Sequence, residues 1–241
     1  MKKLTVLIPC YNEEKGIGKV IKSIPKTKLK AIGYKVDVLV GDNNCKDKTA
    51  EIAKKAGATV ISEKKKGKGN MVKTLVKNIS KDTDIVVMLD GDNTYKPQEM
   101  LRLIEPIDTG SCDVVLGSRL SGHITPGSMP TFNRMGNWMF TFWVRVFYHG
   151  NVTDVCTGYF AWKYANVKQL FKFINSEEFT LEMEMVTKMA KLNYNIISVP
   201  ITYDQRGQSS SELKALTDGR KIMFEGIKNL NWKPYANSEA K

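Results

Sequence analysis

An unbroken apolar run in the first half of the chain, Ile85–Leu89, constrains the fold more than any other stretch. It begins with β-branched residues and ends at the polar turn Asp90-Gly91-Asp92. A short strand without polar alternation is typical of a parallel sheet that helices cover on both faces. We therefore expect a buried central strand whose carboxyl end carries two aspartates.

Strand-like and helix-like segments alternate along the first half of the chain. The expected strands are Leu4–Ile8, Val36–Val40, Ala58–Ile61, Ile85–Leu89 and Asp113–Gly117. Apolar residues at helical spacing lie between them, and Asn12 is the expected N-cap of the first helix. This order predicts an α/β fold with a Rossmann-like, doubly wound, mostly parallel sheet flanked by helices.

The second half of the chain is less regular, but no composition break separates it from the first. Its expected elements are helices near Phe132–Tyr148 and Glu182–Leu192, strands near Gly158–Trp162 and Ile196–Tyr203, and an amphipathic C-terminal helix from Lys214 to about Leu230. We expect a single domain over residues 1–232 and a polar tail over 233–241.

Within the helix expected near Phe132–Tyr148, the stretch Trp138–Tyr148 is apolar nearly all round, with Thr141 and Arg145 as exceptions. Helices of this kind are usually buried, and burial is the expectation here. The alternative is a helix that lies in a membrane interface, with its aromatic side chains at headgroup depth.

Length, charge and cysteine content limit the class of protein. The chain has 241 residues, a formal net charge of +12 and four widely spaced cysteines. We expect a cytoplasmic protein with free thiols, because there is no Cys-x-x-Cys pair and the first apolar run is too short for a secretory leader. The positive charge favours a polyanionic partner: nucleic acid, an anionic membrane surface or a phosphorylated substrate.

Acidic residues recur where the expected strands end. Glu13, Asp42, Asp90 and Asp92 all follow strands of one parallel sheet, so they should gather at its carboxyl edge, where ligands bind in such sheets. Two carboxylates in one turn can hold a hard cation and leave its other positions open to phosphate oxygens. The sequence thus suggests a metal–diphosphate site at Asp90 and Asp92, although a solvated turn remains the simpler alternative.

Several basic residues could bind further phosphate groups at the same edge. Lys68 lies in Gly67-Lys68-Gly69, which lacks the spacing of a P-loop and is otherwise an exposed basic loop. Arg119 and Arg206 follow expected strands, and Arg134 and Asn137 open the aromatic helix. A guanidinium grips phosphate oxygens in a fixed fork, although each arginine alone is more often a surface residue.

Taken in order, these motifs resemble family 2 glycosyltransferases with the GT-A fold, and within them the polyprenyl-phosphate (dolichyl-phosphate) hexose synthases. The matching stretches are Ile8–Glu13, Gly41–Thr49, Gly67–Gly69, Asp90–Asp92, Gly117–Arg119, Asp154–Tyr159, Glu182–Glu184 and Val199–Arg206. Each stretch is weak alone, and the ordered set covers nearly the whole chain.

The resemblance implies a role for each matching residue. Pro9, Tyr11, Glu13 and Asp42 would hold the nucleotide, together with Lys68, within a nucleotide-binding half over residues 1–118. Asp90 and Asp92 would hold Mg²⁺ or Mn²⁺ on the donor diphosphate and are the expected catalytic residues with Arg119. The acceptor-binding half, residues 119–232, would meet the lipid phosphate through four side chains: Arg119, Arg134, Asn137 and Arg206.

Two departures bear on the donor and the acceptor loop. Thr94 stands where many relatives carry a glutamine that ligates the metal, and Asp90–Tyr95 is more similar to users of UDP-sugars than to GDP-mannose enzymes. Ser209–Lys214 replaces the Gly-Glu-Ser-Lys that follows the arginine in relatives.

The resemblance implies an inverting transfer of a hexose or N-acetylhexosamine from a nucleoside-diphosphate sugar to a polyprenyl phosphate, by an enzyme attached peripherally to the cytoplasmic face of a membrane. Two other functions remain open. A sugar nucleotidyltransferase shares this type of core, but it requires a glycine-rich loop for the triphosphate after the first strand. In this chain the corresponding segment, Asn12–Lys15, is acidic. An RNA-binding module would suit the charge, but Lys64–Lys68 lacks interleaved aromatic residues, and we expect no nucleic-acid partner.

Overall fold

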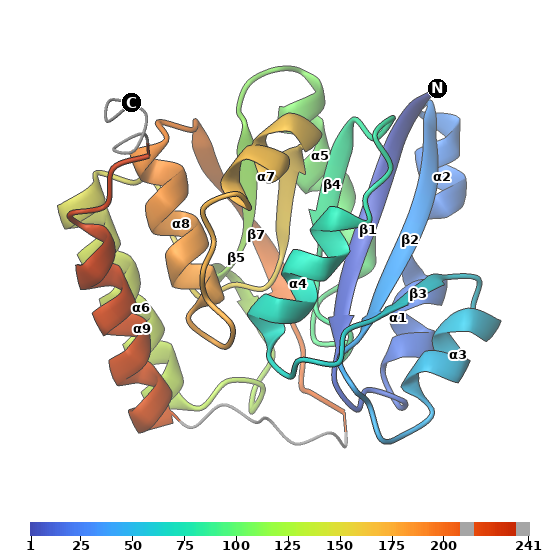
Figure 1. The fold of residues 1–241 in the computed structure, drawn as a ribbon, viewed down its shortest axis with the longest axis horizontal. Coiled ribbons are helices and arrows are strands. Elements are labelled where there is room, and N and C mark those ends of the chain that lie inside the picture. Colours follow the sequence, from blue (N-terminus) through green and yellow to red (C-terminus); the bar gives the residue numbers. More distant parts are fainter. Residues whose placement is uncertain (208–214, 235–241) are drawn as a thin grey trace.

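The computed structural model describes residues 1–207 and 215–234. These residues form a seven-stranded sheet with the order β3-β2-β1-β4-β6-β5-β7 (Figure 1). The strands are β1 (Lys2–Cys10), β2 (Tyr34–Asp42), β3 (Thr59–Ser62), β4 (Ile85–Met88), β5 (Val114–Ile124), β6 (Phe160–Lys163) and β7 (Ile196–Tyr203). Only β6 among them runs antiparallel to its neighbours, β4 and β5. The mostly parallel α/β sheet expected from the sequence is therefore confirmed.

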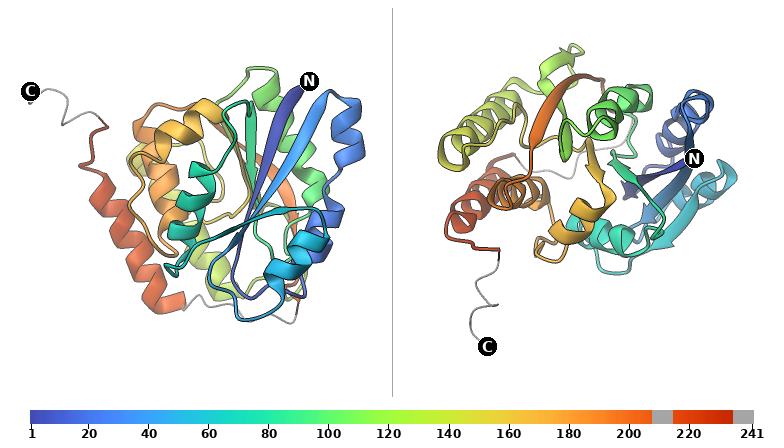
Figure 2. Two further views of the ribbon diagram at one scale, coloured as in Figure 1. Left: turned by 45° about the vertical axis from the view of Figure 1, so that its right-hand side comes forward. Right: turned by 90° about the horizontal axis from the view of Figure 1, so that it is seen from above.

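Helices cover both faces of the sheet (Figure 2). One hydrophobic core joins the sheet to α4 (Lys68–Lys77), α7 (Tyr164–Leu170) and α8 (Leu181–Lys191), with α6 (Thr131–Tyr148) and α9 (Ala215–Asn229) beyond them. The other joins it to α1 (Ile17–Ser23), α2 (Lys26–Ala31), α3 (Thr49–Lys55) and α5 (Met100–Asp108), which follows the short 3₁₀ helix η1 (Pro97–Glu99). This arrangement explains why the central strand has no polar alternation: both of its faces are buried.

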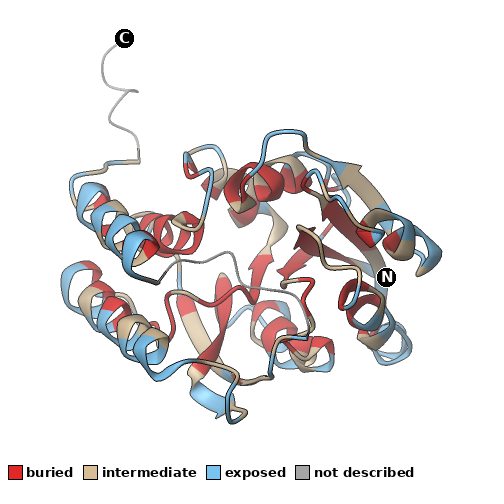
Figure 3. Ribbon diagram, turned by 90° about the horizontal axis from the view of Figure 1, so that it is seen from below, coloured by how far each residue is buried: buried red, intermediate tan, exposed pale blue. Residues whose placement is uncertain are grey.

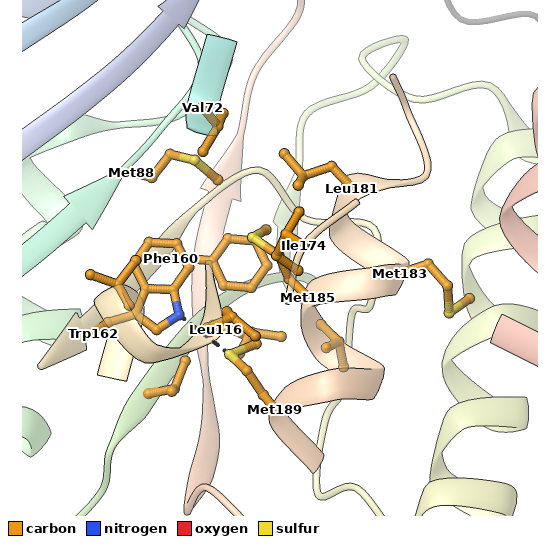
Figure 4. Packing of buried hydrophobic residues seen from close by; sticks show 14 of the residues in the cluster. Val72, Met88, Leu116, Phe160, Trp162, Ile174, Leu181, Met183, Met185 and Met189 are labelled. Atoms are coloured by element: carbon orange, nitrogen blue, oxygen red, sulfur yellow. Dashed lines mark hydrogen bonds between the residues drawn. The ribbon is translucent and has the colours of Figure 1, made fainter. Parts of the chain in front are cut away.

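The hydrophobic core between the sheet and α4, α7 and α8 is packed around two stacked aromatic rings of β6. Phe160 and Trp162 lie with ring centroids 5.0 Å apart and planes 3° from parallel. The indole N–H of Trp162 donates to the sulfur of Met189 on α8 at 3.3 Å, so its only polar group is satisfied (Figure 4). A buried Trp that also finds a partner for its N–H loses little on leaving water, and it fixes α8 against the antiparallel strand.

Two local expectations were wrong. Helices α2 and α7 were not anticipated, and Asn12 does not cap the first helix, which begins at Ile17 after Gly16. Asn12 instead adopts a left-handed conformation (φ 55°), and its side-chain oxygen accepts the backbone N–H of Lys46 at 2.7 Å. Its amide therefore joins the turns that follow β1 and β2 rather than starting a helix.

The expected burial of the aromatic helix was also wrong. Helix α6 lies beside α9 at one end of the molecule, with much of its surface open to solvent (Figures 1 and 3). The exposed large apolar side chains on these two helices are Phe132, Met135, Trp138, Met139, Phe142, Val146, Phe147, Leu216, Phe224 and Ile227. Only one side of α6, including Phe140 and Val144, joins the core. Within the described residues, no helix is both long and apolar enough to cross a membrane.

A buried ion pair on α8 anchors the loop that precedes this helix. Lys188 Nζ lies 2.5 Å from Glu184 Oε1, and the two side chains are 2% and 0% exposed. Glu184 also accepts the backbone N–H groups of Asn175 and Ser176, and Lys188 donates to the carbonyl of Phe173. Burial alone would raise the pKa of Glu184, but the Lys188 ammonium and these N–H groups bring that pKa below its usual value.

Replacing Lys188 with methionine should lower the free energy of unfolding by about 3 kcal/mol, because it leaves the Glu184 carboxylate buried without its counter-ion. Urea denaturation at neutral pH measures this loss. A group with a lowered folded pKa contributes stability that is lost as the pH falls through that pKa. The difference between wild type and variant should therefore shrink below pH ~4, near the ordinary glutamate pKa.

The matched control is Lys55→Met on α3. Lys55 pairs with Glu51 at the same i, i+4 spacing, but the two side chains are 74% and 55% exposed. This variant should leave the urea midpoint unchanged. Equal effects of the two substitutions would contradict a special contribution from the buried pair.

Candidate active site

A cavity of about 700 Å³ opens at the carboxyl edge of the parallel strands. Figure 3 looks onto this edge and shows buried segments of the sheet at its centre, with α6 and α9 to one side. Residues at the ends of β1, β2, β4 and β7, together with Arg119 of β5 and the start of α4, line one part of the cavity, and residues of α6, α8 and α9 line another. The strand ends thus supply polar groups and the helices supply an apolar extension.

Asp90 and Asp92 follow β4 and both line this cavity. Asp92 is 3% exposed, and its Oδ1 accepts the hydroxyl and the backbone N–H of Thr94 at 2.6 and 3.0 Å. These two hydrogen bonds from Thr94 therefore fix the orientation of the Asp92 carboxylate. Gly158 lies directly against the Asp90 carboxylate: a Cβ at position 158 would stand 2.4 Å from Asp90 Oδ2. Only glycine leaves the Asp90 carboxylate where it is.

Each of these aspartates is paired with a cationic side chain. Lys68 Nζ lies 2.7 Å from Asp90 Oδ1 and 2.7 Å from Glu182 Oε1. Arg206 Nη2 lies 2.5 Å from Asp92 Oδ2, and its Nη1 lies 4.0 Å from Glu13 Oε1. Burial alone would lower the pKa of Lys68, but its two carboxylates outweigh burial and raise that pKa. Lys68 is therefore charged at neutral pH.

Glycines on both sides of Lys68 allow its loop to approach the loop before α8. A Cβ on Gly67 would stand 2.2 Å from the carbonyl oxygen of Glu177, and one on Gly69 would stand 2.1 Å from that of Ser176. The backbone N–H of Gly69 donates to the Glu177 carbonyl at 2.9 Å. Gly67 also has a φ of 124°, which disfavours any side chain. This close approach of the two loops directs the Lys68 side chain into the cavity rather than into solvent.

Arg119 forms a buried fork with Asp154. Its Nε and Nη2 lie 2.7 and 2.8 Å from the two carboxylate oxygens, and its backbone N–H donates to the same carboxylate at 3.0 Å. The two residues are 7% and 0% exposed. Arg119 also lines the cavity, with its guanidinium carbon 5.3 Å from the ring centroid of Tyr203. Asp154 therefore fixes the orientation of a cation at the cavity wall.

The structure gathers most, but not all, of the expected site residues. Those that line the cavity are Pro9, Tyr11, Glu13, Lys68, Asp90, Asp92, Arg119, Asn137 and Arg206. Asp42 lies outside it, where its Oδ1 accepts the backbone N–H of Cys45 at 2.9 Å. Arg134 is exposed and lines a shallow hollow on the outer side of α6. The ammonium of Lys66 lies over the ring of Tyr11 in a cation–π contact, 4.3 Å from the ring centroid.

Sequence reasoning missed three residues that shape the cavity. Glu182, 7% exposed, holds Lys68, and its only signal was its place in the matched Glu182–Glu184 stretch. Asn43 lines the cavity in place of its neighbour Asp42, and its side chain binds the backbone of Gly67 and Lys65. Tyr95 accepts the backbone N–H of Gly158 at 2.7 Å through its hydroxyl. The only sequence signals for Asn43 and Tyr95 were their places in the stretches Gly41–Thr49 and Asp90–Tyr95, which gave neither residue a role.

The donor set at Asp90 and Asp92 suits a hard divalent cation such as Mg²⁺ or Mn²⁺, because both groups offer carboxylate oxygens. Asp92 Oδ2 is buried and accepts no hydrogen bond, although it pairs with Arg206. In the part of the chain that the structure describes, no three His, Cys, Asp or Glu side chains gather as a complete metal site. A cation here would thus need ligands from a bound molecule.

Two thiols also line the cavity, Cys10 and Cys156. Burial raises the pKa of both well above the usual value, and nearby carboxylates add to this shift. Both remain protonated at neutral pH, which makes them poor nucleophiles. Neither His123 nor His149, both within the described residues, is among the lining residues. The ionised groups of the cavity are therefore carboxylates, lysines and arginines.

The model of the family described as glycosyl transferase family 2 matches residues 5–171, which run from within β1 to beyond β6 and include both aspartates. The chain belongs to this family. A dolichyl-phosphate hexose transferase of Haloferax volcanii is 34% identical over 206 residues, which cover 84% of this chain and 83% of the relative. The low-salt glycan biosynthesis hexosyltransferase Agl6 of the same organism is 32% identical over 225 residues, which cover 92% of this chain but only 52% of Agl6. The chain thus spans about half the length of that relative.

Among solved structures, glucosyl-3-phosphoglycerate synthase from Mycobacterium tuberculosis superposes with a TM-score of 0.74. The match covers 95% of this chain and 79% of the other at 20% identity. That enzyme was crystallised with Mn²⁺, UDP and phosphoglyceric acid. At this identity the likeness concerns the fold, and the fold of this family 2 chain is GT-A, as expected from the sequence.

Replacing Arg119 with methionine should lower the free energy of unfolding by about 3 kcal/mol, because Asp154 would remain buried and uncompensated. The double variant Arg119→Met/Asp154→Asn removes both charges and should recover part of the loss. Chemical denaturation of the three proteins measures both effects. Arg102→Met, at a pair with Glu99 in which the arginine is 62% exposed, is the control and should change little. A double variant less stable than Arg119→Met would contradict the argument from unpaired charge.

Proposed function

We propose that this protein transfers a hexose or N-acetylhexosamine from a nucleoside-diphosphate sugar to a polyprenyl phosphate of the dolichyl type, with inversion at the anomeric carbon. The product would be a lipid-phosphate-linked sugar for glycan or glycoprotein assembly. The relative named a dolichyl-phosphate hexose transferase supports the acceptor class. The UDP-bound structural neighbour supports a UDP-sugar as donor, and GDP-mannose is the second candidate.

One observation carries this proposal: a single cavity joins the two aspartates to an apolar mouth. At one end lie Asp90, Asp92 and Lys68, which suit a diphosphate with its cation. At the other end lie Phe132 and Leu216, whose side chains are 52% and 71% exposed. A sugar nucleotide and a lipid phosphate need such a polar-to-apolar passage, since one substrate is water-soluble and the other lies in a bilayer.

The donor would lie at the strand ends. We place the nucleotide against Pro9, Tyr11 and Glu13, and its diphosphate near Asp90, Asp92 and Lys68. Mg²⁺ or Mn²⁺ held by the two aspartates would stabilise the charge that builds on the leaving diphosphate. Asp42 lies outside the cavity, so Asn43, which lines it, is the better candidate for contact with the base or ribose.

The acceptor would approach from α6 and α9. Its phosphate would meet Arg119, Asn137 and Arg206, which line the cavity, while Arg134 would act outside it, near lipid headgroups. A phosphate monoester has a second pKa of about 6, so at neutral pH it is already an anionic nucleophile and needs no general base. A cavity lined by neither histidine is consistent with this chemistry. Attack of the phosphate oxygen from the face opposite the nucleotide turns an α-linked donor into a β-linked product.

The alternative functions predict different results. A sugar nucleotidyltransferase would form the sugar nucleotide from a nucleoside triphosphate and a sugar phosphate, with release of diphosphate. The decisive assay incubates the protein with labelled UDP-glucose, UDP-N-acetylglucosamine or GDP-mannose and a short polyprenyl phosphate. We expect label in the lipid phase from one donor. Release of diphosphate from UTP and a sugar phosphate, or salt-dependent RNA retention on filters, would favour the alternatives.

We expect UDP with Mn²⁺ to raise the melting temperature by several degrees, because a ligand at a hundred times its Kd stabilises the folded state by ~2.7 kcal/mol. EDTA should abolish the shift. Asp92→Asn should lose most of it, since the cation would keep one aspartate only. Asp82→Asn, at a side chain that is 70% exposed and far from the cavity, should keep it. A full shift in Asp92→Asn at limiting metal would refute the assigned metal site, and a shift with GDP alone would change the donor.

We also propose that the exposed face of α6 and α9 rests on the cytoplasmic surface of the membrane that carries the acceptor. Trp138 and Phe142 stack on this face with centroids 5.7 Å apart and are 62% and 55% exposed. Phe132 and Leu216 continue the same apolar surface into the cavity mouth. Arg134 and Arg220 add positive charge beside it, worth about 1 kcal/mol each near anionic lipid. The helices would lie in the interface and not across it.

Serine at both Trp138 and Phe142 should lower partition onto anionic vesicles about tenfold or more, because each buried aromatic side chain contributes ~1.5–3 kcal/mol. Co-sedimentation with liposomes measures this directly. Ile32→Ser is the matched control, since Ile32 is 60% exposed but belongs to neither helix. Equal binding of all three proteins would exclude α6 as the membrane contact, and equal binding to neutral vesicles would exclude the electrostatic contribution.

A further inference from the structure

Both carboxylates of the metal site are already neutralised by the protein itself. Lys68 pairs with Asp90 and Arg206 with Asp92, at 2.7 and 2.5 Å. An ammonium or guanidinium at these distances occupies the position that a divalent cation would take beside the same oxygens. Binding of a bare metal ion must therefore move or repel a positive charge.

Lys68 is the more firmly fixed of the two cations. It is the first residue of α4, between two glycines that press against the backbone of residues 176–177. Its side chain is 18% exposed, and that of its second partner, Glu182, is 9% exposed. Glu182 lies at the start of α8, whose position the Glu184–Lys188 pair fixes. A second carboxylate therefore keeps Lys68 in the cavity even when Asp90 binds something else.

The charges near Lys68 distinguish a bare cation from a metal–diphosphate complex. Asp90 and Glu182 together carry two negative charges and Lys68 one positive charge, so an added cation meets a net charge of −1, half of what the two carboxylates would present without Lys68. A diphosphate brings its own negative charges. It offers the displaced ammonium new oxygen partners and supplies the metal ligands that the protein lacks.

We propose that Lys68, tethered by Glu182, keeps bare divalent cations out of the Asp90 site and admits them together with a nucleoside diphosphate, to which its ammonium then turns. This inference rests on the proposed function, because it requires a diphosphate ligand. It gives Glu182 the role of a positioning residue: it holds Lys68 within reach of both Asp90 and the diphosphate. Metal and nucleotide binding are then strongly coupled, and each raises the affinity for the other by the same factor.

The test is the affinity for Mn²⁺ without nucleotide, measured from the EPR signal of the free ion. Lys68→Met keeps the aliphatic stem and removes the charge, and it should bind Mn²⁺ about tenfold more tightly than wild type. Glu182→Gln should bind it more weakly, because the cavity loses a negative charge and Lys68 then pairs with Asp90 alone. Lys68→Arg retains the cation and should stay close to wild type. Opposite shifts in the first two variants would not arise from a general loss of structure.

Lys65→Met is the matched control. Lys65 lies in the same loop and pairs with Glu177, but it is exposed and does not line the cavity. Its loss should leave the affinity for Mn²⁺ unchanged. Circular dichroism and the melting temperature of each variant establish that it is folded before the titration is interpreted.

The same titration with saturating UDP measures the coupling. In wild type, UDP should tighten Mn²⁺ binding, and in Lys68→Met this gain should fall about tenfold. Unchanged Mn²⁺ affinity in Lys68→Met, with normal sugar transfer by wild type, would overturn this inference and leave the proposed function intact. Absence of both Mn²⁺–UDP binding and transfer in wild type would overturn the two together.

Discussion

The close approach of two backbone segments determines where the charges of the cavity lie. Gly67 and Gly69 contact the carbonyls of residues 176–177, and the buried Glu184 carboxylate holds this loop through the backbone N–H groups of Asn175 and Ser176. The buried carboxylate is stable because Lys188 and backbone N–H groups satisfy it. An ion pair in the core thus fixes a loop, and the loop directs Lys68 toward Asp90.

The antiparallel strand β6 explains the other side of the site. In a purely parallel sheet β4 and β5 would be neighbours, whereas here β6 lies between these strands, runs antiparallel to both and enters from the carboxyl edge. Its approach segment brings Gly158 against Asp90 and within 2.7 Å of the Tyr95 hydroxyl. It also carries Asp154, which orients Arg119. The change in strand direction therefore brings both halves of the chain into one cavity.

The parts of the site that the sequence predicted are those set by strand geometry. Asp90, Asp92, Glu13 and Arg206 follow strands of one sheet, and the carboxyl ends of such strands meet at one edge. Asp42 also follows a strand, but its carboxylate closes its own turn on Cys45 instead of facing the cavity. That choice depends on loop conformation, which the residue pattern does not report.

The aromatic helix shows a second limit of sequence reasoning. An apolar surface all round a helix indicates contact with something apolar, but the same pattern arises in a protein core and at a lipid surface. Phe140 and Val144 of α6 face the core, while Trp138 and Phe142 do not. Only the arrangement of neighbouring helices distinguishes the two sides. Similarly, the sequence alone indicates that Glu182 lies on a solvated helix face. The structure places Lys68, the first residue of α4, beside it.

These features lead to a single electrostatic requirement. Buried or half-buried carboxylates are costly unless they are paired, and so are the cations opposite them. In the structure the aspartates and the cations satisfy one another. On our proposal, a metal ion would bind the two aspartates in place of Lys68 and Arg206. These two cations would then pair with the donor diphosphate and the acceptor phosphate. Every charge then exchanges one partner for another, so the cavity can bind two anionic substrates without leaving an unpaired charge at any stage.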